Sequence, residues 1–300
     1  MQGVNLSAAQ MQNADLSEAH MPDADLRRAI LWDADLRRAN LNRANLRGTQ
    51  MQRAYFAGVQ MNNANLSGAH LHDADFREAE MSNVILRDAE LRKAYFRGAQ
   101  MQGANLYGVK MQGASFENAN LEYADFGGAI MQKTSFRRAN LKWANFAKAK
   151  MESVYLRWAN MQGANFSLSL MSGTPRQSIL LLNTNIGAST NHGGAMRFVD
   201  MSQAIFDGDT DWKNVFIDAS VNVPSRFRKQ MSNPCQWIGR YGNNKPLSEK
   251  LFFSHWRGWL QQDPDWTKVQ WQLVAPKQWH NVEPSAPPEG CHWTPPTLAK

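Results

Sequence analysis

Hydrophobic residues recur at every fifth position along the first half of the chain. A Leu, Phe or Met occupies each fifth position from Leu6 to Met171, which makes 34 consecutive units without a slip. Ala, or occasionally Val, Thr or Ser, lies two positions before each of these central residues. A period of five fits neither the 3.6-residue turn of a helix nor the alternation of a strand. It predicts a chain that turns a corner with every unit and closes a four-sided coil after four units.

Positions four units apart are expected to stack, so the central residues sort into four columns. Leu and Phe fill two opposite columns, whereas Met and Leu fill the other two. One column contains Phe56, Phe76, Phe96, Phe116 and Phe136. Aromatic rings are expected to stack along such a column, with flexible Met side chains filling the space between. We therefore interpret the Met-rich columns as core and not as a cofactor site.

Neighbouring coils must stabilise one another, because a single coil buries too little apolar surface to fold alone. At a spacing of about 4.8 Å between paired strands, the coils would form a rod roughly 40 Å long. The first coil, which begins at Val4, has no preceding helix to cover Leu6 and Met11. We expect that this chain is a piece of a longer protein, or that a partner or second copy covers this end.

The repeated unit has a recognisable form, as in Ala14-Asp15-Leu16-Ser17-Glu18 and Ala104-Asn105-Leu106-Tyr107-Gly108. These tandem units resemble the pentapeptide-repeat proteins over more than half of the chain. The resemblance implies an all-β fold, a right-handed quadrilateral parallel β-helix (the pentapeptide-repeat solenoid), which is non-enzymatic and often dimeric. It also implies an alternative role, because some members act on DNA gyrase or other type II topoisomerases by presenting an acidic, DNA-like rod.

The charge of the chain argues against that DNA-mimic role. The whole chain has a net charge of +7, and residues 1–173 carry 20 Lys and Arg against 16 Asp and Glu. Asp15, Asp35 and Asp75 share one outer column, but Tyr55 and Tyr95 interrupt it. A mimic needs a continuous negative stripe, because its partner's groove binds phosphate charge. We therefore disfavour a gyrase-directed mimic or inhibitor and expect a protein-binding or scaffold module.

The composition changes near residue 173, and four segments are predicted. They are a pentapeptide-repeat β-helix over 1–173, a loop excursion over 174–198, a closing coil over 199–222 and a Trp/Pro-rich capping or dimerisation tail over 223–300. Within the closing coil, the motif at Ile217 is one residue out of phase. In the tail, a short helix is predicted over 246–262, with Pro246 in its first turn, and a short strand over 266–273.

Cysteine usage and hydropathy bear on the compartment. Cys235 and Cys291 lie far apart in the sequence and form no metal-binding pattern. We expect two unpaired thiols in a cytoplasmic protein, and a disulfide in an oxidising compartment is the alternative. The sequence contains no transmembrane segment and no signal peptide that we recognise.

The strongest candidate for partner binding lies on the late coils, where aromatic and basic positions meet. Trp143 follows Tyr123 by four units and Trp158 follows Arg138 by four, so each pair is expected to stack. The candidate surface comprises Tyr123, Arg137, Arg138, Lys142, Trp143, Arg157 and Trp158. Aromatic rings beside cations suit a protein, an anionic surface or single-stranded nucleic acid. In the competing interpretation, the Trp-rich tail folds back onto these side chains.

We find no nucleotide-binding loop, nucleophile elbow or zinc motif, so neither an enzyme nor a cofactor is expected. His70 and His72 flank Leu71, with Asp73 nearby, and such a pair suggests surface metal binding. No third ligand is evident from the sequence, so no metal site is assigned. The expected partner is a protein of unknown identity or a second copy of the chain, bound through the N-terminal coil or the C-terminal tail. Nucleic acid is not expected.

Overall fold

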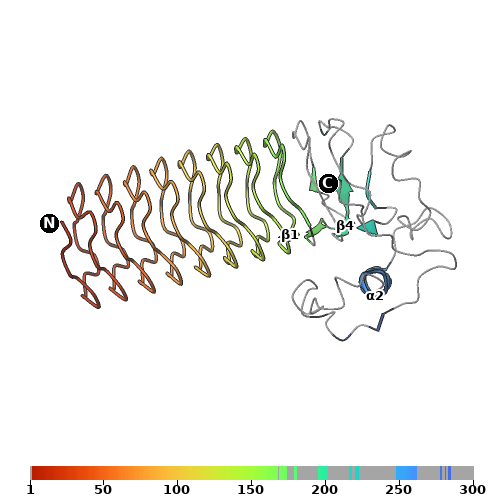
Figure 1. The fold of residues 1–300 in the computed structure, drawn as a ribbon, viewed down its shortest axis with the longest axis horizontal. Helices are drawn as coiled ribbons and strands as arrows, with labels where there is room; N and C mark the ends of the chain where they lie inside the picture. Colours follow the sequence, from red (N-terminus) through yellow and green to blue (C-terminus); the bar gives the residue numbers. More distant parts are fainter. Residues whose placement is uncertain are drawn as a thin grey trace, which may run out of the picture.

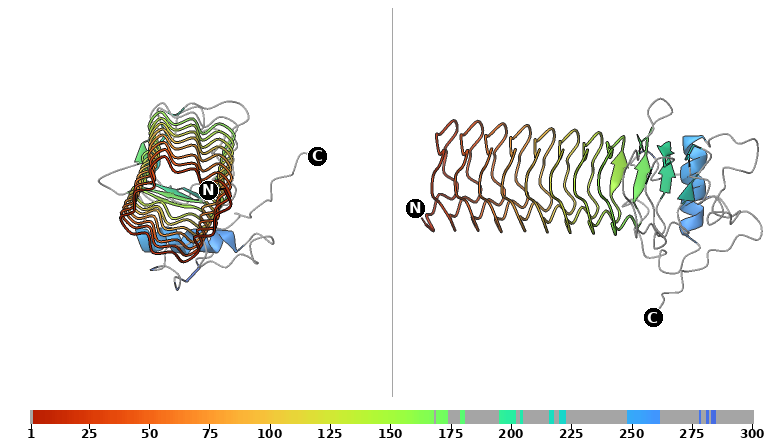
Figure 2. Two further views of the ribbon diagram at one scale, coloured as in Figure 1. Left: turned by 90° about the vertical axis from the view of Figure 1, so that its left-hand side faces the viewer. Right: turned by 90° about the horizontal axis from the view of Figure 1, so that it is seen from above.

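The protein is a four-sided rod of stacked coils, described here from a computed structural model (Figures 1 and 2). The structure describes residues 2–167, 169–173, 179–180, 195–201, 204, 216–217, 220–222, 248–261, 278, 281 and 283–284. Parallel bridges join residues four units apart along the rod, from Asn5↔Asp25 to Asn145↔Asn165. The four-sided coil predicted from the period of five, and the right-handed quadrilateral β-helix that the family resemblance implies, are therefore confirmed.

In units with Asn or Asp before the central residue, all five backbone N–H groups have defined acceptors, as the unit around Leu66 shows. Two donate to the next coil and one to the preceding coil, as in the 2.7 Å bond from Leu66 to the carbonyl of Ile85. A fourth closes the corner turn, with 3.0 Å between the nitrogen of Ala69 and the carbonyl oxygen of Leu66. The fifth, on Ser67, donates to Oδ1 of Asn65 at 3.0 Å. Stacking therefore supplies most of the partners that the buried backbone requires.

The Asn or Asp before the central residue has a structural role in the turn, in addition to facing solvent. Its side-chain oxygen accepts the N–H two positions later, a local turn that these short polar side chains favour. The bond recurs at Asn5, Asp15, Asp25, Asp35, Asn40, Asn45, Asn65, Asp75, Asn105, Asn120, Asp125, Asn140, Asn145, Asn160 and Asn165. The sequence pattern indicates only that this position faces water, and the structure shows that it also completes the turn.

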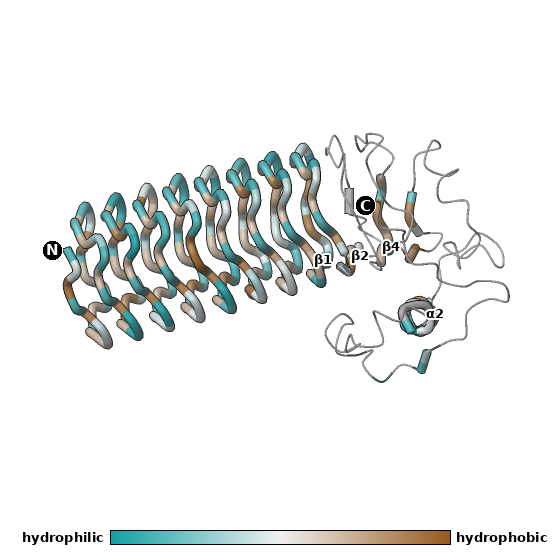
Figure 3. Tube along the Cα trace, in the orientation of Figure 1, coloured by the Kyte–Doolittle hydropathy of each residue, from teal (hydrophilic) through white to brown (hydrophobic). Residues whose placement is uncertain are grey.

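Central residues and the small residues two positions earlier form the core. Phe56 and Phe76 stack with ring centroids 4.5 Å apart and planes 1° apart, and the stacking continues from Phe76 to Phe96 at 4.9 Å. Where both Phe columns are occupied, their rings meet edge to face, as Phe126 and Phe136 do at 5.4 Å and 82°. Figure 3 shows hydrophobic and hydrophilic stretches alternating around each coil. The predicted columns of core residues are therefore present.

Short strands continue two sides of the rod at the end opposite the N-terminus (Figure 1). One side is formed by β1 (Lys150–Glu152), β2 (Leu170–Ser172), β4 (Ala195–Arg197) and β6 (Phe216–Ile217), and the other by β3 (Ile179–Leu180) and β5 (Val199–Asp200). Leu170 pairs with Ala195, which is five units later, whereas Ile179 pairs with Val199 after the usual four. One extra unit therefore lies between β2 and β3, and the insertion of a whole unit preserves the phase of the repeat.

Strands β3 and β4 lie inside the interval 174–198 predicted as a loop excursion and pair with neighbouring strands, and the other residues of that interval lie mostly outside the described part of the chain. The slip of one residue at Ile217 is present: Met196 pairs with Ile217, one position beyond the partner that the regular register would give.

Helix α2 (Glu249–Leu260) lies within the interval predicted as a helix, but it begins three residues after Pro246. The N–H of Leu251 donates to Oγ of Ser248 at 3.3 Å, so Ser248 is the N-cap that defines the start. Among the described residues, no helix has the length and hydropathy required to cross a membrane.

The buried face of α2 packs against the last strands. The ring of Phe252 lies edge-on to that of Phe216 in β6, with centroids 5.0 Å apart. The guanidinium carbon of Arg197 lies 4.7 Å from the Phe252 centroid. Trp256 is fully buried nearby, 6.1 Å from Phe253. The predicted strand over 266–273, both cysteines and most of the Pro-rich tail lie outside the described residues.

We expect Phe96→Ala to lower the free energy of unfolding by about 3–5 kcal/mol, because it removes one ring from the stacked column. Phe96→Leu should cost less than about 1.5 kcal/mol, since Leu36 occupies the same column in an earlier coil. Chemical denaturation of the two variants checks this. Equal losses would contradict this expectation and would show that the aromatic ring, and not its apolar volume, supplies the stabilisation.

Asn65→Ala should destabilise the rod by about 0.5–1.5 kcal/mol, because the backbone N–H and hydroxyl of Ser67 lose their acceptor. The Ser67 amide should also exchange its hydrogen faster. Gln60→Ala is the matched control: Gln60 precedes a central residue too, but its side chain does not accept the N–H of Asn62, which donates to Asn42 instead. Unchanged exchange at Ser67 in Asn65→Ala would contradict the proposed role of the Asn side chain.

Candidate functional site

Trp158 is the centre of the candidate surface, because three arginine side chains surround its indole. The guanidinium carbons of Arg157, Arg138 and Arg137 lie 4.6, 5.1 and 5.8 Å from the ring centroid. All three distances are within the range of cation–π attraction, about 6 Å. Arg138 and Trp158 occupy the same corner of two consecutive coils. Their spacing of four units therefore brings the two side chains together, as predicted.

Tyr123 and Trp143 occupy another corner of the rod in two consecutive coils. This corner borders the same flat side as the corner of Arg138 and Trp158. Tyr123 and Trp143 have positive φ, 60° and 58°, which is the conformation that the third residue of these turns requires. The Trp143 indole lies over the backbone of the next corner, where a Cβ on Gly163 would overlap it. Among the described residues, Tyr123 and Trp143 form no ring–ring contact with each other, so the predicted stacking of this pair is replaced by packing of Trp143 on Gly163.

A ladder of asparagines runs between these two corners. The side-chain amide of Asn140 donates to Oδ1 of Asn120 at 3.0 Å, and Asn140 pairs through its backbone with Asn160. Lys142 lies beside the ladder and is half-buried, and its N–H donates to Oδ1 of Asn140 at 3.4 Å. The candidate surface is therefore one flat side of the rod bordered by aromatic corners.

Few carboxylates neutralise the cations of this surface. Oε1 of Glu117 lies 3.9 Å from Nη1 of Arg137, and this is the one ion pair that the seven candidate residues make within the described part of the chain. Nε of Arg157 is buried and has no hydrogen-bond partner there. Arg138 and Arg157 therefore form no ion pair with a carboxylate within the described residues.

The aromatic side chains of the candidate surface are exposed. Tyr123, Trp143 and Trp158 are 63%, 48% and 36% accessible to solvent. The competing interpretation, in which the Trp-rich tail covers them, concerns residues that lie mostly outside the described part of the chain. Exposed aromatic residues of this size are typical of an interface.

The early coils are different, because their carboxylates are paired with arginines. Within single units, an arginine Nη2 lies close to Oδ2 of the aspartate two positions earlier. The distances are 2.6 Å for Arg27–Asp25, 2.5 Å for Arg37–Asp35 and 2.6 Å for Arg77–Asp75. Between coils, Arg43 contacts Asp23 and Arg53 contacts Asp33. The hydrogen bond from Arg37 lowers the pKa of Asp35 below its usual value. In the acidic column, Asp35 and Asp75 are therefore neutralised by arginines, whereas Asp15 bonds Ser17, so the column does not form a continuous negative stripe.

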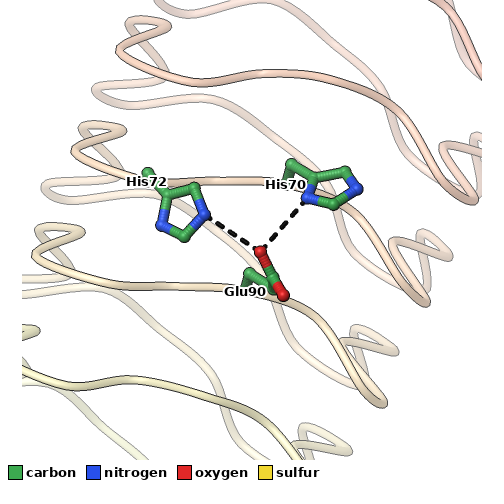
Figure 4. Close-up of side chains that lie close together, drawn as sticks. All are labelled: His70, His72 and Glu90. Carbon is green, nitrogen blue, oxygen red and sulfur yellow. Dashed lines mark hydrogen bonds and ion pairs between the residues drawn. The ribbon is translucent and has the colours of Figure 1, made fainter.

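A second cluster, missed from the sequence, lies on the middle coils. Nδ1 of His70 and Nε2 of His72 lie 3.3 and 3.0 Å from Oε2 of Glu90 (Figure 4). The other oxygen of Glu90 accepts a hydrogen bond from Nζ of Lys110 at 3.0 Å. These hydrogen bonds lower the pKa of Glu90 to about 2. The bond from Lys110 has the largest effect, and those from the two histidines have smaller effects. Glu90 follows His70 by four units, so the stacking rule contained the signal that would have found it.

Comparisons with known proteins concern the repeat. The sequence profile of the "Pentapeptide repeat region" family matches residues 49–126, and that of "Pentapeptide repeats (8 copies)" matches residues 1–31, 19–56 and 114–152. No curated protein matches the chain.

Several solved structures share the repeat. HetL, a pentapeptide repeat protein involved in heterocyst differentiation regulation from the cyanobacterium Nostoc, is 24% identical over 72% of this chain and 90% of its own, with a TM-score of 0.31. QnrB1, a plasmid-mediated fluoroquinolone resistance protein, is 18% identical over 68% and 95%, with a TM-score of 0.35. A protein of the Arabidopsis thaliana thylakoid lumen is 28% identical over 30% and 67%, with a TM-score of 0.27.

Proposed function

This chain belongs to the pentapeptide-repeat family, and from that premise we propose that it is a non-enzymatic binding or scaffold module. The observation that supports this most is the arginine-surrounded, exposed Trp158 on the late coils. An exposed indole flanked by cations gives little to folding, but it suits a binding surface, where Trp and Arg dominate the energetics.

We further propose that the partner is a protein with an acidic segment. Residues 101–173 contain 8 Lys and Arg against 4 Asp and Glu, so the late coils attract anions. Arginine pairs with carboxylates in two-pronged geometry, and the flat side between the corners accommodates an extended segment. The early coils, with their paired charges, offer no comparable attraction.

The backbone of the rod suits a scaffold because its side chains hold fixed spacings. Bridges repeat with every fourth unit, so the columns on the outside have one register along the whole rod. The rod is already ordered before a partner that matches this spacing binds, so the entropic cost of binding is low.

We also propose that the tail covers the last coil through α2 and that a homodimer forms through the N-terminal coil or the tail.

Reversal of charge on the candidate surface should abolish partner binding. Proteins captured from a native extract by the wild-type chain should be lost with Arg138→Glu/Arg157→Glu and reduced at least tenfold with Trp158→Ala. The matched control is Arg87→Glu/Tyr107→Ala, which removes the exposed Arg–Tyr pair of another side, where the guanidinium lies 5.1 Å from the ring.

Three results would contradict the proposal. One is equal capture by the wild type and the Arg138→Glu/Arg157→Glu variant. Another is a strictly monomeric protein, by light scattering, that retains no partner at all. The third is capture of single-stranded nucleic acid alone, with an affinity that falls steeply as salt is added.

The gyrase-directed alternative receives no support from the paired charges of the early coils. We expect no inhibition of gyrase supercoiling by this protein at any concentration at which it stays soluble, because Asp25, Asp35 and Asp75 are each bound by an arginine. A supercoiling assay decides this. Inhibition that disappears in an Asp35→Asn/Asp75→Asn variant would restore the mimic hypothesis.

A further inference from the structure

The cluster of His70, His72 and Glu90 is the only group of three or more metal-ligating side chains in the described part of the chain. Both rings come from one coil and the carboxylate comes from the next, and both rings turn toward the same oxygen (Figure 4). We propose that these three side chains bind a divalent transition-metal ion of the zinc class on the outside of the rod. This role is separate from the partner-binding surface of the late coils.

The separations of the donor atoms fit such an ion. Ligands about 2.0–2.1 Å from zinc in tetrahedral geometry lie roughly 3.3 Å from one another. The two nitrogen-to-oxygen distances are 3.3 and 3.0 Å, and all three donor atoms lie within 4.8 Å of one another. The His70 side chain is 44% accessible, which leaves its ring room to rotate toward a shared ion.

The donor set selects the class of metal. Two imidazole nitrogens and one carboxylate oxygen suit zinc, nickel, cobalt and copper, whereas calcium and magnesium prefer sites made of oxygen alone. The cluster supplies three ligands and faces solvent, so water or a group from another molecule completes the coordination. A site with three protein ligands and an open position has the composition of exchangeable zinc sites.

The fold holds the three ligands in place before any ion arrives. A parallel bridge joins His70 to Glu90, which fixes the separation of their backbones. Lys110, one coil further, bonds Oε1 of Glu90 at 3.0 Å and leaves Oε2 directed at the two rings. Metal-binding carboxylates are commonly oriented by a second hydrogen bond of this kind. Lys110 also adds a positive charge, which lowers the affinity of the site for a cation.

The competing role for the cluster is an ion-pair network without metal, in which one or both imidazoles donate to Glu90. Such a network would not distinguish zinc from magnesium. Selective binding of zinc therefore separates the two roles.

Calorimetric titration of the full chain with Zn²⁺ tests the proposal. Because the tail contains further cysteine and histidine residues, the readout is the difference between wild type and variant. The wild type should bind one more equivalent than His70→Ala or His72→Ala, and Glu90→Gln should weaken that equivalent at least tenfold. His20→Ala and Glu80→Gln, which change the same residue types on another side of the rod, should match the wild type.

Crystals soaked in Zn²⁺ should show an anomalous peak about 2.0–2.1 Å from Nδ1 of His70 and Nε2 of His72. Equal stoichiometry for the wild type and His72→Ala would overturn the proposal, as would zinc bound elsewhere only. Equal affinity for Zn²⁺ and Mg²⁺ would identify the cluster as an ion-pair network.

Discussion

The register of four units between stacked coils is the constraint on which the rest of the structure depends. Three of the five N–H groups in each unit of the rod donate to a neighbouring coil, so each coil is held in register by the coils on either side. Once the register is fixed, every outer residue of the rod lies beside the residue four units earlier, at the same position of the preceding coil. Core columns, ion pairs and candidate sites are all consequences of this one spacing.

Much of the fold was predictable because the sequence repeats the constraint in 34 units. The Phe columns and the contact of Arg138 with Trp158 followed directly from the spacing of four units. The cluster around Glu90 obeys the same rule, but Glu90 lies 20 residues after His70 and is therefore no near neighbour of the two histidines in the sequence. A search of each outer column for complementary chemistry would have found Glu90 and Lys110 together.

Where the repeat ends, prediction fails for physical reasons. An insertion of one whole unit between β2 and β3 leaves the phase unchanged, so the period alone cannot locate it. Helix α2 starts where Ser248 accepts a hydrogen bond, although Pro246 also suits a first turn. The contact of Phe252 with Phe216 joins segments with no common period, so only the three-dimensional structure reveals it.

The rod separates the residues that fold it from the residues available for function. The coil ladder holds the corner positions at positive φ whether glycine or a bulky residue such as Trp143 or Trp158 occupies them. A bulky residue there costs about 1–2 kcal/mol in backbone strain, and the stacked coils offset this cost. Large aromatic groups therefore occupy corners without altering the core. Because their rings remain exposed, they are free of the core and accessible for the partner binding that we propose.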